Sequence, residues 1–206
     1  MDFDHSHFDP ATLSLSELQC GIWTELTRAC GNPQHPWRLP CLANVFEQVP
    51  QQRIVVLRHV DHAGCVLFAH TDVRSAKVEQ LKQFPAVSWV FYDSERRIQL
   101  IMKGTAKFHL EDAIADQHWN QLETIHQIPY LAPRPPGEPC AAPSVNLPPI
   151  HNAPLSTDEL ARGRQNFAVM TARICQFDIL FLRQTGHLRA RFLCNENGWQ
   201  RSWLQP

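Results

Sequence analysis

Apolar residues recur at helical spacing near the start of the chain, and shorter apolar runs typical of strands follow. The helical set is Leu15, Leu18, Ile22, Leu26 and Ala29. Ser14 and Glu17 stand at its start with the spacing of a capping box. The pattern predicts a helix over residues 14–30, which Gly31 and a proline-containing loop bring to an end.

Runs rich in β-branched and aromatic residues predict a series of strands. We expect strands over residues 53–60, 65–70, 87–92, 97–103, 104–110, 169–175, 177–183, 188–193 and 199–204. Turn sequences at residues 61–64 and 195–198 would join two hairpins. The alternation of Ile98, Leu100 and Met102 gives one of these strands an apolar face.

Further helices would lie outside the sheet. Asp72 can cap a helix that runs to about residue 83, with Val78 and Leu81 facing inward. Another helix is expected over residues 111–122, and a second capping box, Ser156 with Glu159, opens a short one. The chain is therefore predicted to be a β-rich α+β protein of barrel type with peripheral helices.

The length of 206 residues and the hydrophobic content of 44% favour a single domain, residues 1–206. Residues 1–13 are expected to form a flexible tail. Residues 129–154 hold nine of the sixteen prolines, which is typical of a flexible linker. Too few strands follow this segment for a separate domain, so we interpret it as an ordered excursion within one domain.

Composition excludes several classes of protein. The net charge of −1 gives no support for binding nucleic acid or a membrane surface. No apolar run approaches the roughly 20 residues that span a bilayer, and the acidic start does not resemble a signal peptide. The seven cysteines are scattered singly, which favours a reducing cytoplasm, and the eleven histidines form no tight ligand set, so no metal site is expected.

Basic and hydroxyl side chains gather where predicted strands end. The run H-T-D-V-R-S-A-K at residues 70–77 places them at the start of a predicted helix, whose free N–H groups suit a phosphate. Arg53 and Arg58 lie near the ends of the strand before it, and Arg189 and Arg191 share one face of a late strand. From these residues alone, phosphate binding and a set of solvated strand-edge charges are about equally supported.

The order of these motifs resembles the pyridoxamine 5′-phosphate oxidase family. The similar pieces are R-I-V-V-L-R at 53–58, H-T at 70–71, S-A-K at 75–77, Gln99 followed by Gly104, and H-L-R-A-R at 187–191. The form T-D-x-R-S-x-K at residues 71–77 is similar to the oxidase-related branch of FMN-binding proteins. The resemblance extends from about Pro36 to the C-terminus.

The resemblance implies a split β-barrel homodimer with FMN in a cleft at the subunit interface. It assigns to FMN binding Arg53, Val55, Val56, Leu57, Arg58, His70, Thr71, Arg74, Ser75, Lys77, Gln99 and Arg191. Within this set, backbone groups of residues 55–57 would line the isoalloxazine ring. Arg74, Ser75 and Lys77 would hold the phosphate, and Arg191 would contribute from the partner subunit.

The chain departs from the family where the substrate would bind. The vitamin-forming oxidases read R-L-H-D-R where this chain has His187, Arg189 and Arg191, and Phe181 replaces their usual tryptophan. By the same resemblance, Tyr130, Arg134, His187 and Arg189 are the candidate substrate-binding residues. No residue is assigned as a general acid or base, although His187 is the best candidate.

These assignments imply an FMN-dependent oxidoreductase that transfers a hydride from an amine or alcohol substrate to FMN and is reoxidised by O₂. The altered residues at 187–189 favour an alternative, an FMN-binding module or flavin reductase without vitamin B6 turnover. A barrel without FMN that acts as an interaction protein ranks last, because it would not need so many converging polar groups.

Overall fold

A computed structural model describes residue 10, residues 12–147 and residues 155–206. Most of the predicted tail and the last part of the proline-rich segment lie outside the described residues. The chain divides into two compact units. Unit 1 comprises the described residues up to Ala69 with Pro85–Ala106 and Ala172–Pro206, and unit 2 comprises His70–Phe84 with the described residues of Lys107–Thr171.

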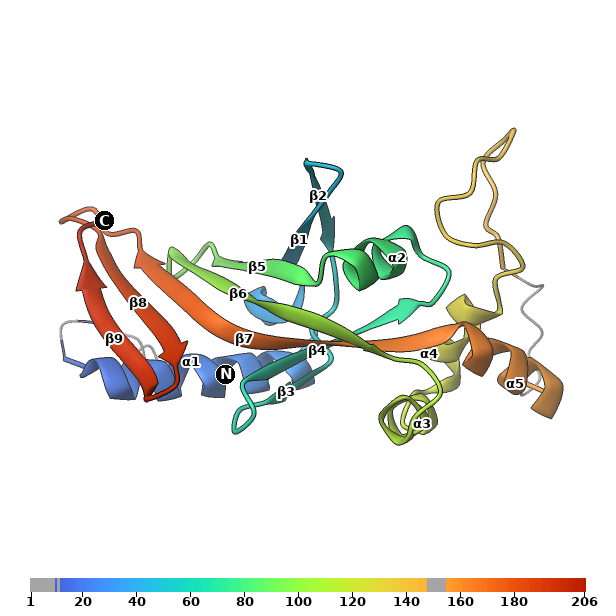
Figure 1. Cartoon of the computed structure of the whole chain (residues 1–206), viewed down its shortest axis with the longest axis horizontal. Coiled ribbons are helices and arrows are strands. Elements are labelled where there is room, and N and C mark those ends of the chain that lie inside the picture. Colours follow the sequence, from blue (N-terminus) through green and yellow to red (C-terminus); the bar gives the residue numbers. More distant parts are fainter. Residues whose placement is uncertain (1–9, 11, 148–154) are drawn as a thin grey trace. The chain divides into compact units, whose positions relative to one another are not determined.

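Nine strands form one antiparallel sheet among the described residues (Figure 1). They are β1 (Cys41–Phe46), β2 (Val49–Ile54), β3 (His59–Asp61), β4 (Val66–Asp72), β5 (Ala86–Asp93), β6 (Ile98–His109), β7 (Phe167–Phe181), β8 (Leu188–Asn195) and β9 (Gly198–Leu204). The strand order is β2-β1-β5-β6-β7-β4-β3, and β8 pairs with both β7 and β9. The predicted β-rich class is confirmed.

Among the described residues, five α-helices and two short 3₁₀ helices accompany the sheet. They are α1 (Leu15–Gly31), η2 (Pro36–Arg38), α2 (Ala76–Gln83), α3 (Ala113–Asn120), α4 (Thr124–Gln127), η3 (Ile128–Leu131) and α5 (Thr157–Asn166). Both predicted capping boxes are present, at the starts of α1 and α5. None of these helices is long and apolar enough to cross a membrane.

The strand predicted over residues 53–60 is wrong, because the chain leaves the sheet between Ile54 and His59. The backbone there bonds to a loop instead. Val55 N–H donates to the Pro40 carbonyl at 3.0 Å, and Leu57 N–H donates to the Arg38 carbonyl at 3.0 Å. The first two residues of the predicted strand, Arg53 and Ile54, belong to β2, and its last two, His59 and Val60, belong to β3. Strand β2 forms a hairpin with β1, which the sequence pattern did not indicate.

Three other predicted boundaries are also wrong. The runs predicted at 97–103 and 104–110 form the single strand β6. The runs predicted at 169–175 and 177–183 form the single strand β7. Helix α2 begins at Ala76 with Ser75 as its N-cap, so Asp72 does not cap it. The Asp72 carboxylate instead accepts hydrogen bonds from Arg74, which lies only two residues further on.

Strands β6 and β7 approach each other very closely at Gly104. A Cβ atom at this position would lie 2.1 Å from the Arg173 carbonyl oxygen, well inside van der Waals contact. Ile98, Leu100 and Met102 on the same strand are buried, as their alternation predicted. Glycine is therefore required at residue 104 by its proximity to the neighbouring backbone.

A buried carboxylate joins α1 to the turn between β5 and β6 within unit 1. Glu25, which is 3% exposed, accepts hydrogen bonds from Arg28 at 2.6 Å and Arg96 at 3.0 Å, and lies 3.3 Å from a ring nitrogen of His35. Burial raises the pKa of the Glu25 carboxyl, but hydrogen bonds from His35 and Arg28 and the charge of Arg96 outweigh it and lower the pKa to about 2. Glu25 is therefore ionised throughout the neutral range.

Candidate functional site

The predicted site residues fall in both units, and each group is described within its own unit. Unit 1 holds Arg53, Val55, Val56, Leu57, Arg58, Gln99, His187, Arg189 and Arg191. Unit 2 holds His70, Thr71, Arg74, Ser75, Lys77, Tyr130 and Arg134.

Lys77 in unit 2 brings together two hydroxyl groups that the sequence places four residues apart. Its Nζ donates to Thr71 Oγ1 at 2.7 Å and to Ser75 Oγ at 2.6 Å. Thr71 is the second-last residue of strand β4. Ser75 is the N-cap of α2, and its side chain makes no capping hydrogen bond. The result is a cation and two hydroxyl groups beside the free N–H groups of a helix start, an arrangement that suits a phosphate.

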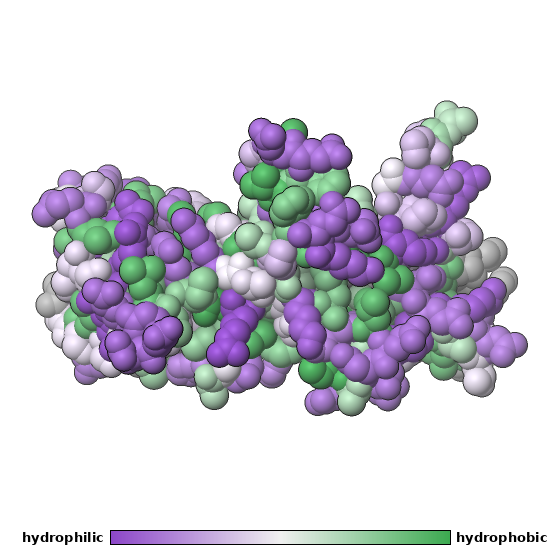
Figure 2. All heavy atoms as spheres, in the orientation of Figure 1, coloured by the Kyte–Doolittle hydropathy of each residue, from purple (hydrophilic) through white to green (hydrophobic). Residues whose placement is uncertain are grey.

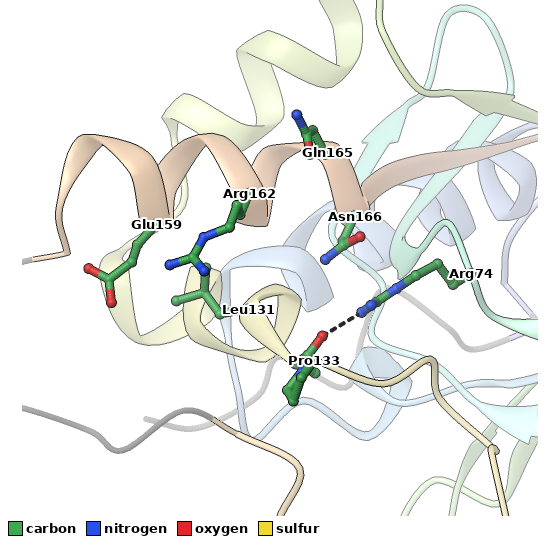
Figure 3. A pocket seen from close by; sticks show the side chains of 8 residues that line it. Arg74, Leu131, Pro133, Glu159, Arg162, Gln165 and Asn166 are labelled. Atoms are coloured by element: carbon green, nitrogen blue, oxygen red, sulfur yellow. Dashed lines mark hydrogen bonds between the residues drawn. The ribbon is translucent and has the colours of Figure 1, made fainter.

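Arg74 makes different contacts from Lys77, which lies three residues further along the chain. Its Nε and Nη2 donate to the two carboxylate oxygens of Asp72 at 3.0 and 2.7 Å. Nη2 also donates to the Ala132 carbonyl at 3.0 Å, the bond drawn in Figure 3. The hydrogen bonds that Arg74 donates to Asp72 raise the pKa of Arg74. Much of the hydrogen-bonding capacity of Arg74 is therefore already used by the protein.

A cavity of about 270 Å³ lies beside Arg74 in unit 2 (Figure 3). Its walls are Arg74, Leu131, Ala132, Pro133, Glu159, Arg162, Gln165 and Asn166. Asn166 closes one side, because its Nδ2 donates to the Tyr130 carbonyl at 2.8 Å and its own carbonyl accepts from Val73 N–H at 2.8 Å. The end of α5, the turn after β4 and the segment around Tyr130 are therefore tied together.

The candidate substrate residues of unit 2 lie on this tied segment. The Tyr130 ring packs edge-on against Trp119 and Phe167. Arg134 is exposed, and its backbone forms two hydrogen bonds with the side chain of Asn146, at 3.3 and 3.0 Å. These two bonds close the described part of the proline-rich loop on itself.

His70 lies against a histidine that the sequence analysis did not select. His70 Nε2 and His118 Nδ1 are 3.0 Å apart, and the His70 ring packs edge-on against Phe167. His118 comes from α3, 48 residues further along the chain. No local pattern could have paired these two residues.

In unit 1, hydrogen bonds to residues 38–40 hold the segment at 55–58 in place. Val55 and Leu57 are buried and their N–H groups are bonded to the loop at 38–40, whereas Val56 is half-buried. The Leu57 carbonyl accepts from Arg38 Nη1 at 2.6 Å, and the same Nη1 donates to the Cys30 carbonyl at the end of α1 at 2.5 Å. Of the three backbone units predicted to line a flavin ring, that of Val56 is the one without a hydrogen bond to another described residue.

Arg53 precedes this segment, Arg58 is its last residue, and Gln99 lies on another strand of unit 1. Arg53 donates to the side-chain oxygen of Asn44 across the β1–β2 hairpin, and burial lowers the pKa of its guanidinium. Arg58 N–H donates to the Phe68 carbonyl of β4 at 2.9 Å. Gln99 is half-buried on β6 opposite Tyr92, and its side-chain amide makes no hydrogen bond to another described residue. Gln99 is therefore available to a ligand.

The two arginines of β8 share one acidic partner in unit 1. Arg189 and Arg191 both donate to the carboxylate of Asp178 on β7. Asp178 was missed by the sequence analysis, although it is the only charged residue in the apolar run at 177–182. His187 is exposed in the loop before β8. Among the described residues, no group of three acidic, cysteine or histidine side chains could hold a metal ion.

Residues 21–110 match the family model of the pyridoxamine 5′-phosphate oxidase FMN-binding domain. Over these residues the chain is similar to the pyridoxamine 5′-phosphate oxidase family. The match includes β1 to β6 and α2, and therefore the Lys77 cluster, Arg53, Arg58 and Gln99. The cofactor of this domain is FMN.

Two curated relatives are similar to parts of the chain. A pyridoxine/pyridoxamine 5′-phosphate oxidase of Teredinibacter turnerae is 34% identical over 85 residues, which cover 39% of this chain and 39% of the relative. The protein of the same name from Yersinia enterocolitica is 30% identical over 146 residues, 64% of this chain and 60% of the relative. The chain thus matches less than two thirds of the length of either relative.

A solved structure establishes the fold. The crystal structure of a pyridoxamine 5′-phosphate oxidase-related, FMN binding protein from Nostoc punctiforme PCC 73102 matches with a TM-score of 0.69 at 22% identity. The match covers 95% of this chain and 99% of that chain. The predicted split-barrel fold is confirmed, with a sheet that is not closed.

The residues of the Lys77 cluster fit the phosphate end of FMN. A phosphate is a dianion with several acceptor oxygens, and the cluster offers an ammonium group and two hydroxyl groups at a helix start. The contacts of Lys77 are already made within unit 2, so little rearrangement of the side chain is needed before a phosphate binds. The cluster therefore has the chemistry that the phosphate of FMN requires.

Proposed function

We propose that the protein is an FMN-dependent oxidoreductase that oxidises an amine or alcohol and reduces O₂ to hydrogen peroxide. The observation that carries the proposal is the assembled cluster of Lys77, Thr71 and Ser75 beside the start of α2. When bound, FMN supplies hydride acceptance and reaction with O₂, which no side chain can provide. For an amine substrate, the balanced reaction converts the amine, O₂ and water to an aldehyde, ammonia and hydrogen peroxide.

The chain's own residues have the tasks of binding and orientation. We assign the phosphate of FMN to Thr71, Ser75 and Lys77, with Arg74 beside them. Arg53, Arg58, His70, Gln99 and the backbone at 55–57 are assigned to the rest of the cofactor, and Arg191 to the cofactor of the partner subunit. Tyr130, Arg134, His187 and Arg189 are assigned to a phosphorylated substrate, since all four side chains can donate hydrogen bonds to an anion.

The visible spectrum of the purified protein, with the released pigment identified by mass, tests cofactor binding. We expect the absorption bands of an oxidised flavin and the mass of FMN. Peroxide detection with pyridoxamine and pyridoxine 5′-phosphates then tests turnover. A colourless protein that also fails to take up added FMN would contradict the proposal as a whole.

The substitutions at 187–189 favour a second candidate, a flavin reductase or FMN-binding module without vitamin B6 turnover. The family's substrate-holding arginine and histidine are replaced here by His187 and Arg189. If FMN is retained while both phosphorylated vitamers produce no peroxide, this second candidate is supported. Oxidation of NAD(P)H with added free flavin would then distinguish the reductase from the binding module.

We also propose that the protein is a homodimer, with FMN at the subunit interface. Apolar side chains on β1 and β2 are exposed, among them Val45 at 54%, Val49 at 54% and Ile54 at 62%. Figure 2 shows hydrophobic atoms on this hairpin next to its hydrophilic tip. Burial of such residues against a second copy would remove apolar surface from water.

Sedimentation of the flavin-loaded protein tests this arrangement. We expect a mass of twice the 23.6 kDa of one chain across the micromolar range. Replacement of Ile54 with aspartate should shift the protein toward the monomer and reduce flavin retention, because a charge would be buried in the interface. A flavin-retaining monomer would contradict the proposal of a shared site.

A further inference from the structure

Asp178 is a carboxylate buried within an apolar strand. The residue is 6% exposed, and its neighbours on β7 include Phe177 and Ile179, both at 0%. Burial of an ionised carboxylate is unfavourable unless opposite charges and hydrogen bonds compensate for it. The compensation comes from two arginines on β8, and the pair lies in the part of the chain that the family resemblance assigns to ligands.

The register of the sheet places the three side chains together. Asp178 stands directly opposite Arg191, and Arg189 is the next residue on the same face of β8. Arg189 donates through Nε at 2.7 Å and through Nη2 at 3.1 Å, one bond to each carboxylate oxygen. Arg191 donates through Nε and Nη2 to Oδ2, both at 3.3 Å. The hydrogen bonds that Arg189 donates to Asp178 raise the pKa of Arg189.

These bonds fix the two guanidinium groups without saturating them. Each arginine uses its Nε and Nη2, which leaves the Nη1 groups for a ligand. Both side chains are 35% exposed, whereas that of Asp178 is 8% exposed. A ligand from solvent can therefore reach the arginines but not the carboxylate that holds them.

We propose that Asp178 is a positioning residue that orients Arg189 and Arg191 as an anion-binding pair for phosphate-bearing ligands. The inference rests on the proposed function, which assigns Arg191 to FMN and Arg189 to the substrate. Asp178 touches neither ligand and acts through the two arginines. It also prevents two like charges on the same face of one strand from turning away from each other into solvent.

The direction in which one substitution changes the affinity for an anion distinguishes positioning from simple electrostatics. Replacement of Asp178 with asparagine keeps the size of the side chain and removes its negative charge. If only charge mattered, removal of an anion beside the two arginines would strengthen the binding of another anion. If Asp178 positions the arginines, the loss of their fixed geometry weakens binding despite the more positive charge.

The first test is a fluorescence titration of the flavin-free, full-length protein with FMN. We expect Asp178→Asn to raise the Kd roughly five- to tenfold, the effect of one weakened charge-assisted bond. Asp116→Asn, which breaks an exposed pair with Arg164, is the matched control and should leave the Kd unchanged. An unchanged or lower Kd for Asp178→Asn would overturn the inference.

A double-mutant cycle with Arg191→Ala identifies the route of the effect. If Asp178 acts through Arg191, the asparagine substitution should add little in the Arg191→Ala background. Arg191→Lys, on a partly exposed side chain, retains the charge without the planar fork and should weaken FMN by a similar factor even if Asp178→Asn does not fold. Full additivity in the cycle, or an unchanged Kd for Arg191→Lys, would refute positioning, whereas a wild-type protein that binds no FMN would refute the proposed function itself.

Discussion

Replacement of Lys77 with alanine is expected to weaken FMN binding by roughly 10- to 100-fold. Lys77 supplies the positive charge of the phosphate cluster and holds the hydroxyl groups of Thr71 and Ser75 at 2.7 and 2.6 Å. A charge-assisted hydrogen bond contributes about 1.5–3 kcal/mol, and 1.4 kcal/mol corresponds to a factor of about ten in Kd. The measurement is the quenching of FMN fluorescence on titration with flavin-free protein.

Riboflavin provides the matched control for this experiment, because it carries the same ring without the phosphate. The Lys77 substitution should leave the affinity for riboflavin unchanged. Equal losses for the two flavins would show that the substitution disturbs the ring site or the fold, and an unchanged affinity for FMN would refute the placement of the phosphate.

Arg74→Ala should weaken FMN binding less than Lys77→Ala does. The guanidinium of Arg74 already has both oxygens of Asp72 and the Ala132 carbonyl as acceptors, so less of it remains for a phosphate. The ratio of the two changes in Kd therefore measures how much of the hydrogen-bonding capacity of Arg74 is taken up by Asp72 and Ala132. A larger loss for Arg74→Ala would mean that its bond to Asp72 gives way when FMN binds.

Replacement of Glu25 with glutamine should lower the free energy of unfolding by roughly 3 kcal/mol at neutral pH. The substitution removes a buried negative charge that pairs with Arg28 and Arg96, and leaves Asp93 as the remaining carboxylate partner of Arg96. Breaking one partner of a buried ionic group costs about 3–5 kcal/mol. Urea unfolding followed by tryptophan fluorescence measures the difference, since Trp23 lies two residues away in the same helix.

The effect of Glu25 should depend on pH in a defined direction. The folded protein lowers the pKa of this carboxyl from 4.5 to about 2, so folding favours the ionised form. Its contribution is complete above pH 4.5 and disappears as the pH falls through the folded value of about 2. The wild-type protein should therefore lose stability between these limits, and Glu25→Gln should lose less over the same range.

Glu79→Gln is the matched control, because Glu79 is 69% exposed and lies 3.9 Å from Lys82. An exposed pair of this kind contributes less than about 1 kcal/mol. Equal effects of the Glu25 and Glu79 substitutions, or an unchanged acid transition in Glu25→Gln, would contradict the role given to the buried carboxylate.

Features that depend on neighbouring residues in the sequence were predicted well. The capping boxes at Ser14 and Ser156 need only a hydroxyl and a glutamate three residues apart, and both formed. The hairpin between β8 and β9 followed from its turn residues and is correct. Local hydrogen bonds are fully specified by the residues that make them, so their patterns carry over directly to structure.

Features that depend on distant residues could not be predicted from the pattern. The break after Ile54 arises because the backbone N–H groups of Val55 and Leu57 bond to carbonyls 15 and 19 residues earlier. The partners of Asp178 and His70 come from other elements of the fold. Asp72 and Ser75 show the same limit at short range, since either can cap a helix and the contact with Arg74 decides between them.

Arg38 ties the end of the first helix to the segment predicted to line the flavin ring. A single guanidinium nitrogen donates to the carbonyls of Cys30 and Leu57, at 2.5 and 2.6 Å. Fraying of the last turn of α1 would therefore displace the Arg38 side chain and weaken its hydrogen bond to the Leu57 carbonyl. If the backbone at 55–57 lines the flavin as we propose, weakening the last turn of α1 should speed the release of FMN, although this helix need not touch the cofactor.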